Sequence, residues 1–155
     1  MVRPRSSGWL SRSVLAVSEL TPELINETIL AEYEEMRNLC TEIGDGYVMT
    51  SWEVDEATDI RPGGYVSGPT QFKIADGALW YLTFAALGRI EPMALTSELS
   101  MRFLRPAIGT RMICRATLEA ANRRSVVGTC HIWVDGAPDR ITSTAQGTYA
   151  IPMPR

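Results

Sequence analysis

One stretch of about twenty residues constrains the fold of this chain more than any other. It runs from Gly68 to Gly88 and reads GPTQFKIADGALWYLTFAALG, with apolar side chains on nearly every side of a helical projection. Pro69 suits the first turn of a helix and Gly88 is typical of a C-terminal stop, so we expect a helix over 69–87. Such a helix is normally buried all round. Because one sheet covers only one side, we expect a second subunit, an N-terminal helix, or both, to cover the other.

Asp76 stands in the middle of this apolar helix and is the most anomalous residue of the sequence. A buried carboxylate is rarely left without partners, since an uncompensated charge in apolar surroundings is costly. It can serve as a general base or a nucleophile. The alternative is a structural residue whose hydrogen bonds cross a subunit interface. Both interpretations stay open on the sequence alone.

The segments that flank the central helix predict an α+β domain. An amphipathic helix is expected to begin at Thr21, Pro22 and Glu23 and to end near 44–46. The alternation of side chains over 47–60 predicts one strand. Four further strands are expected at 95–104, 110–120, 125–134 and 141–151, each bounded by turn residues. The expected sheet therefore has five antiparallel strands. No repeat or linker divides the chain, so we expect a flexible tail over 1–20 and a single domain over 21–155.

Composition excludes several classes of protein. The 155 residues carry a net charge of -3, which disfavours nucleic-acid binding, and no apolar run reaches the ~18 residues of a membrane span. Cys40, Cys114 and Cys130 are odd in number and widely spaced, which predicts neither a disulfide framework nor a zinc site and indicates a reducing compartment such as the cytoplasm. His131 is the only histidine, so a multi-histidine metal site within one chain is excluded. We expect no metal and no redox cofactor.

Two stretches of the sequence resemble a known family. They are GGYVSGPTQFKIADGALW (63–80) and LTSELSMRFLRPAIGTRMICRATLEAANRRSVVGTCHIWV (95–134), and they are similar to the hotdog-fold thioesterases of the phenylacetic-acid-degradation (PaaI-like) branch. The shared pattern is a glycine-containing turn, a hydrophobic helix that carries an Ala-Asp pair, and a strand that ends in Phe-Leu-Arg-Pro-Ala. The resemblance implies a long helix wrapped by a five-stranded sheet, a homodimer or a tetramer built from two dimers, and acyl-coenzyme A (acyl-CoA) thioesterase activity.

The resemblance also implies roles for individual residues. Asp76 corresponds to the catalytic carboxylate of the family, Gly68 to the residue whose backbone N–H polarises the thioester carbonyl, and Thr96 to a strand hydroxyl that orients water in some members. The chain departs from the family at two positions, with Ser67 where a His is usual and Arg61 near the usual Asn or Gln. Ser67 can be a helix cap or a substrate contact. Arg61 can be a solvated loop residue or a replacement for the missing amide.

Several arginines are candidate contacts for the phosphates of coenzyme A (CoA), because a guanidinium fork matches phosphate geometry. They are Arg102, Arg105, Arg123 and Arg124. Each of them alone is also explained as a solvated charge at the end of a strand.

The spacing between two of the site residues has a consequence for the assembly. Gly68 and Asp76 are eight residues apart, or about 12 Å on one helix at ~1.5 Å per residue. They cannot act on the same thioester carbon, so we expect Gly68 of one subunit to meet Asp76 of its partner. Two alternatives stay open: an acyl-CoA-binding protein that lacks hydrolysis, and a hotdog dehydratase or hydratase. The second usually needs a His beside the acid, whereas His131 lies far along a later strand.

Overall fold

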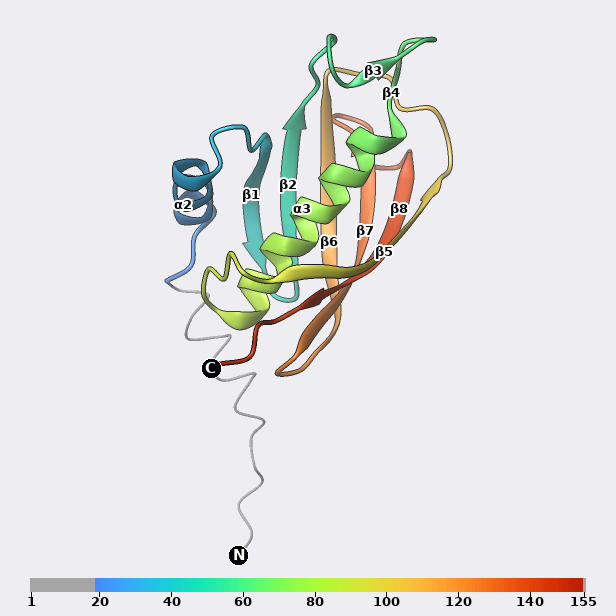
Figure 1. The fold of residues 1–155 in the computed structure, drawn as a ribbon. Helices are drawn as coiled ribbons and strands as arrows, with labels where there is room; N and C mark the ends of the chain where they lie inside the picture. The colour runs from blue at the N-terminus through green and yellow to red at the C-terminus, as the bar shows by residue number, and fades with distance from the viewer. Residues whose placement is uncertain (1–18, 155) are drawn as a thin grey trace, which may run out of the picture.

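The structure is a computed structural model that describes residues 19–154, so all but two residues of the expected 1–20 tail lie outside the described part. Within 19–154 the chain forms two helices, a six-stranded antiparallel sheet and a two-stranded hairpin (Figure 1). The helices are α2 (Pro22–Glu32) and α3 (Gly68–Leu87). The strands are β1 (Asn38–Gly44), β2 (Tyr47–Glu53), β3 (Ile60–Arg61), β4 (Tyr65–Val66), β5 (Leu95–Phe103), β6 (Arg111–Ala121), β7 (Ser125–Val134) and β8 (Ser143–Ala150).

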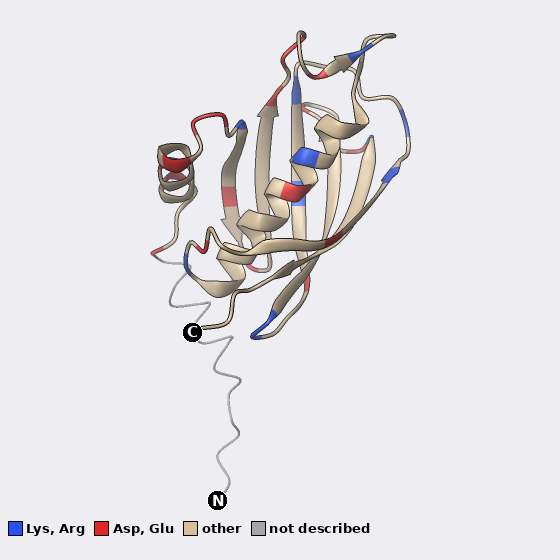
Figure 2. Cartoon of the chain, viewed as in Figure 1, with Lys and Arg blue, Asp and Glu red and all other residues tan. Residues whose placement is uncertain are grey.

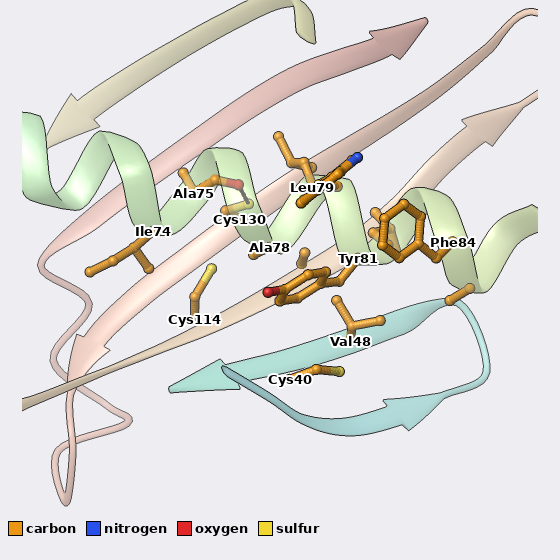
Figure 3. Close-up of a cluster of buried hydrophobic side chains, with 14 of the residues drawn as sticks. Cys40, Val48, Ile74, Ala75, Ala78, Leu79, Tyr81, Phe84, Cys114 and Cys130 are labelled. Carbon is orange, nitrogen blue, oxygen red and sulfur yellow. Dashed lines mark hydrogen bonds between the residues drawn. The ribbon is translucent and has the colours of Figure 1, made fainter. Parts of the chain in front are cut away.

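The sheet has the strand order β1-β2-β6-β7-β8-β5 and curves around α3 (Figure 1). The two largest fully buried side chains, Tyr81 and Phe84, come from α3 and pack among side chains of the sheet (Figure 3). Residues 77–85 are all buried within a single chain, because β5 crosses the helix on the side that the other strands leave open. The helix thus needs no second subunit over this half. Its first half keeps an exposed stripe that includes Phe72 and Lys73.

The helix predicted over 21–44 is wrong beyond Glu32. Thr21 caps α2 as expected, with its side chain accepting the Leu24 N–H at 3.1 Å, but α2 ends at Glu32 and β1 follows as a sixth strand. Over residues 38–44 the spacing of apolar residues fits a helix, but it also fits the alternation of a strand in which Asn38 and Cys40 face inward. The segment becomes a strand because it pairs with β2. The α2 helix packs on β1, so it covers the edge of the sheet and not α3.

The remaining elements follow the sequence patterns closely. The strand expected over 47–60 ends at Glu53, and a tight β3–β4 hairpin precedes α3; its turn needs Gly63 and Gly64, whose φ angles are +102° and +81°. Gly88 ends α3 in the left-handed conformation, as predicted. The four later strands lie within two residues of their expected bounds. No helix among the described residues is long and apolar enough to cross a membrane.

Candidate active site

Asp76 lies at the middle of α3. The sequence predicts a buried carboxylate, whereas Asp76 is only half-buried in the single chain. One of its carboxylate oxygens, Oδ1, accepts two hydrogen bonds, from Thr96 Oγ1 at 2.6 Å and from the Tyr149 hydroxyl at 2.8 Å. The same tyrosine hydroxyl is 3.0 Å from the backbone oxygen of Asp76. Oδ2 accepts no hydrogen bond from any residue that the structure describes. One oxygen is therefore held, and the other is open to a reactant.

The register of the sheet places both hydroxyls at this carboxylate. Thr96 on β5 pairs directly with Tyr149 on β8, and side chains opposite each other on two strands share a face of the sheet. A β-bulge at Ser97 shifts the alternation of β5, so that Thr96 joins Leu99 and Met101 on the inward side. Ser97 instead donates to the backbone oxygen of Thr148 at 3.2 Å. The bulge is the reason that a threonine faces Asp76.

The sequence interpretation missed Tyr149. It lies within the strand predicted over 141–151, and the alternation of that strand would have placed a buried tyrosine on the face that covers the central helix. Burial, followed by the hydrogen bond and the charge at Asp76, raises the pKa of the Tyr149 hydroxyl well above its ordinary value, with Thr96 opposing the shift. Tyr149 therefore keeps its proton at any physiological pH and acts toward Asp76 as a donor.

A cleft of about 970 Å³ opens beside these three residues. Its other walls are aromatic and apolar over much of their area, and the residues concerned are Tyr33, Met36, Trp52, Trp80, Pro92, Ala94 and Leu95. The Tyr33 ring meets Trp80 edge-on, with the ring centroids 6.1 Å apart. Lys73, one turn before Asp76, also lines the cleft, and these two residues are the only charges on α3 (Figure 2). The cleft thus offers an apolar wall next to a carboxylate.

A second acid in the cleft wall, Asp59, has a structural role. It is 3% exposed and accepts hydrogen bonds from Arg37 at 2.7 Å, Trp52 Nε1 at 3.0 Å and Thr70 Oγ1 at 3.1 Å. Burial acts to raise the pKa of Asp59, but these bonds and the Asp55 backbone N–H outweigh it and hold the pKa at about 2. Through Asp59 the network links Arg37, which directly precedes β1, with Trp52 on β2 and with Thr70 in the first turn of α3. Nothing in the sequence pattern singled out Asp59.

Gly68 is the first residue of α3, and its N–H donates to no group in the described part of the chain. It lines a different hollow, of about 560 Å³, together with Arg61, Arg105 and Phe103. Ser67 is the N-cap, since its hydroxyl oxygen accepts the Thr70 N–H at 3.3 Å. The structure therefore brings Arg61 and Arg105 to Gly68, whereas Asp76 and Thr96 lie in the other cleft.

The other charged candidates lie elsewhere. Arg123 and Arg124 are in the β6–β7 turn, at the opposite end of the sheet from the β3–β4 hairpin (Figures 1 and 2). Arg102 and His131 face a hollow on the outer side of the sheet, away from α3. His131 thus does not approach Asp76 of the same chain. Residues 19–154 contain no group of three His, Cys, Asp or Glu side chains placed to ligate a metal.

The three cysteines are buried and free, as the sequence analysis expects for apolar core residues. Burial raises the pKa of the Cys40 thiol to about 12. Cys130 lies beneath α3 with its Sγ 3.8 Å from the backbone oxygen of Ala75 (Figure 3). These thiols form part of the packing under the helix and do not contribute to the candidate site.

Comparison with known proteins supports a thioesterase fold. Residues 63–139 match the family model described as the thioesterase superfamily. A structure from Silicibacter sp. TM1040, assigned as a thioesterase, is 26% identical, covers 86% of this chain and 93% of its own, and has a TM-score of 0.76. A thioesterase variant from Pseudomonas aeruginosa is 16% identical over 86% of this chain and 96% of its own, with a TM-score of 0.72.

The phenylacetic acid degradation protein PaaI from Thermus thermophilus is also similar in structure. It is 18% identical, covers 79% of this chain and 99% of its own, and has a TM-score of 0.63. At this identity the likeness concerns the fold. No curated protein matches the chain significantly in sequence.

Proposed function

The chain belongs to the thioesterase superfamily of hotdog-fold proteins, and on that premise we propose that it hydrolyses an acyl-CoA to CoA and a carboxylic acid. The observation that carries the proposal is the carboxylate of Asp76. Oδ1 is held by two hydroxyl donors, Oδ2 is open, and an apolar cleft begins beside it. A carboxylate held in this way can take a proton from water next to a bound acyl group.

In the proposed reaction, Asp76 Oδ2 takes a proton from a water molecule as the water oxygen bonds to the thioester carbon. The π electrons of the carbonyl move onto its oxygen, and the Gly68 N–H donates to the resulting oxyanion at the positive end of α3. The tetrahedral intermediate then collapses, the C–S bond breaks, and the proton held by Asp76 passes to the leaving sulfur. General base catalysis contributes roughly 10²- to 10⁴-fold, and one oxyanion donor roughly 10²- to 10³-fold.

We propose that the active site is shared between two subunits of a homodimer. Gly68 and Asp76 of one chain line separate hollows and stand about 12 Å apart along α3. A thioester that touches both therefore needs Gly68 from one copy and Asp76 from another.

The edges of the sheet favour β5 as the contact between the two copies. The β1 edge is covered, because the Asn26 side-chain amide both donates to and accepts from the backbone of Cys40, at 2.8 Å each. The β5 edge has no neighbouring strand within the described chain, and an unpaired edge is a template for pairing with another copy. Phe72 on α3 and Phe103 on β5 are 42% and 54% exposed, which adds apolar surface beside this edge.

Arg61 and Arg105 are the proposed contacts for the phosphates of CoA. Both line the hollow that contains Gly68, so a thioester carbonyl at Gly68 would leave the rest of CoA near two guanidinium groups. Arg123 and Arg124 follow the end of β6, an 11-residue strand that spans about 35 Å, and they cannot share one phosphate with Arg61 in the same chain.

Thiol release from a panel of acyl-CoAs, followed with a thiol-reactive dye, tests the function. We expect turnover by the wild-type protein and a loss of at least 10²-fold in Asp76→Asn, which preserves the shape of the side chain. The rival function is acyl-CoA binding without hydrolysis. It would be supported if calorimetry detected binding of the same acyl-CoAs while neither protein released thiol.

A further inference from the structure

We propose that Tyr149 is a positioning residue for the reaction, which acts with Thr96 to fix the Asp76 carboxylate through Oδ1 and so selects Oδ2 as the oxygen that takes the proton. The inference rests on the proposed function of Asp76. The resemblance to the family assigns no role to Tyr149.

The geometry separates the two oxygens of the carboxylate. Thr96 and Tyr149 donate to the same oxygen, at 2.6 and 2.8 Å, from strands that are directly paired. Two donors on one oxygen prevent rotation of the carboxylate, which would otherwise be free in a half-buried side chain. The two lone pairs of Oδ2 then have fixed directions relative to the cleft, and the reacting water binds along one of them. Without the tyrosine hydroxyl, the carboxylate would be free to rotate about its remaining hydrogen bond to Thr96.

The burial of Tyr149 fits this role. The residue is 5% exposed. Its hydroxyl oxygen, the only polar atom of the side chain, contacts both the carboxylate and the backbone oxygen of Asp76. Its ring is therefore fixed by packing, while its hydroxyl contributes only to the carboxylate and to the helix beneath it. The substrate is acted on by Asp76 and not by Tyr149, so loss of the hydroxyl affects kcat and leaves KM nearly unchanged.

The first experiment compares Tyr149→Phe with Tyr81→Phe in thiol-release kinetics. Both substitutions remove one buried hydroxyl and keep the ring, but the Tyr81 hydroxyl donates to the backbone oxygen of Asn38 at 2.6 Å, away from Asp76. We expect kcat to fall roughly 10- to 100-fold in Tyr149→Phe, the size of a lost hydrogen bond to a charged group. Tyr81→Phe is expected to lower the thermal unfolding temperature without changing kcat.

The second readout is the split between kcat and KM, which separates a positioning role from a purely structural one. Tyr149→Phe keeps the ring in the wall of the cleft, so KM for the acyl-CoA should stay close to the wild-type value while kcat falls. A tyrosine that only supported the fold would change the shape of the cleft, and its loss would raise KM together with the fall in kcat.

Thr96 variants complete the test. Thr96→Val should reproduce the effects of Tyr149→Phe, Thr96→Ser should restore most of the activity, and the double variant should depart from the product of the single effects because both donors share Oδ1. The proposal is overturned if Tyr149→Phe keeps wild-type kcat, or if KM rises in step with the fall in kcat. An active Asp76→Asn variant would instead overturn the function proposed for Asp76, so the two failures are distinguishable.

Discussion

Gly68 and Asp76 stand on the same helix, two turns apart, and yet they line different hollows of the molecule. The first offers an unused backbone N–H at the start of α3, and the second offers a carboxylate with one open oxygen. This arrangement leaves half of the proposed thioesterase site at each end of the first half of α3. It leads to a direct test of the shared site.

A heterodimer of Gly68→Pro and Asp76→Ala chains should recover activity that both homodimers lack. One of its two sites combines an intact Gly68 with an intact Asp76, and the other carries both lesions, so we expect about half of wild-type turnover if the sites act independently. Differently tagged, co-expressed chains allow the mixed dimer to be purified and assayed for thiol release.

Gly68→Ala is the matched control for this experiment. Proline suits the first helical position, so Gly68→Pro removes the N–H without breaking α3. A Cβ at Gly68 would meet the Phe103 ring at 3.4 Å, an ordinary contact, so the alanine variant keeps the donor and should stay active. Mixed dimers that are as inactive as the homodimers would contradict a shared site.

The oligomer should have at least twice the 17.1 kDa mass of one chain in light scattering at micromolar concentration. Phe72→Glu should shift it toward the monomer and remove activity, because a charge then lies on the apolar surface beside the β5 edge. Leu24→Glu is the control: Leu24 is 43% exposed on α2, at the covered edge of the sheet. A stable, active monomer would refute the proposed dimer.

Single-turnover hydrolysis in ¹⁸O-water should label the carboxylic acid product and leave Asp76 unlabelled. A general base never bonds to the acyl group, whereas a nucleophilic carboxylate forms an anhydride from which water can return labelled oxygen to the side chain. Mass spectrometry of the peptide that contains Asp76 measures the difference. Label in that peptide would replace the general-base step with direct attack.

Asp59→Asn should lower the free energy of unfolding by about 2 to 3 kcal/mol at pH 7, because it breaks the pair with Arg37 and weakens the bonds to Trp52 and Thr70. The folded-state pKa of Asp59 is about 2, below its ordinary value of 3.8. The ionised carboxylate therefore stabilises the fold above pH 3.8, and this contribution disappears as the pH falls through about 2.

Urea unfolding of wild type and Asp59→Asn at several pH values measures this difference. The difference in free energy of unfolding between the two proteins should be constant at neutral pH and should decrease between about pH 4 and about pH 2. A gap that does not depend on pH over this range would show that the Asp59 charge does not contribute to stability.

Local patterns in the sequence determine α3 and the four strands that follow it. Pro69 and Gly88 mark the ends of the helix, and alternation with turn residues marks the strands, because each of these signals acts over a few residues. The resemblance to hotdog thioesterases added Asp76, Gly68 and Thr96 as a candidate site, and the structure places Thr96 against Asp76.

Tertiary structure alone decided the rest. The segment 38–44 fits a helix or a strand equally well by its own pattern, and it becomes β1 because β2 offers a partner and α3 offers an apolar surface. Tyr149 lies 53 positions after Thr96, and the two meet at Asp76 only through the register of β5 and β8 and the bulge at Ser97. Register is a long-range property: it follows from which strands pair and where one residue is inserted, and no local spacing encodes it.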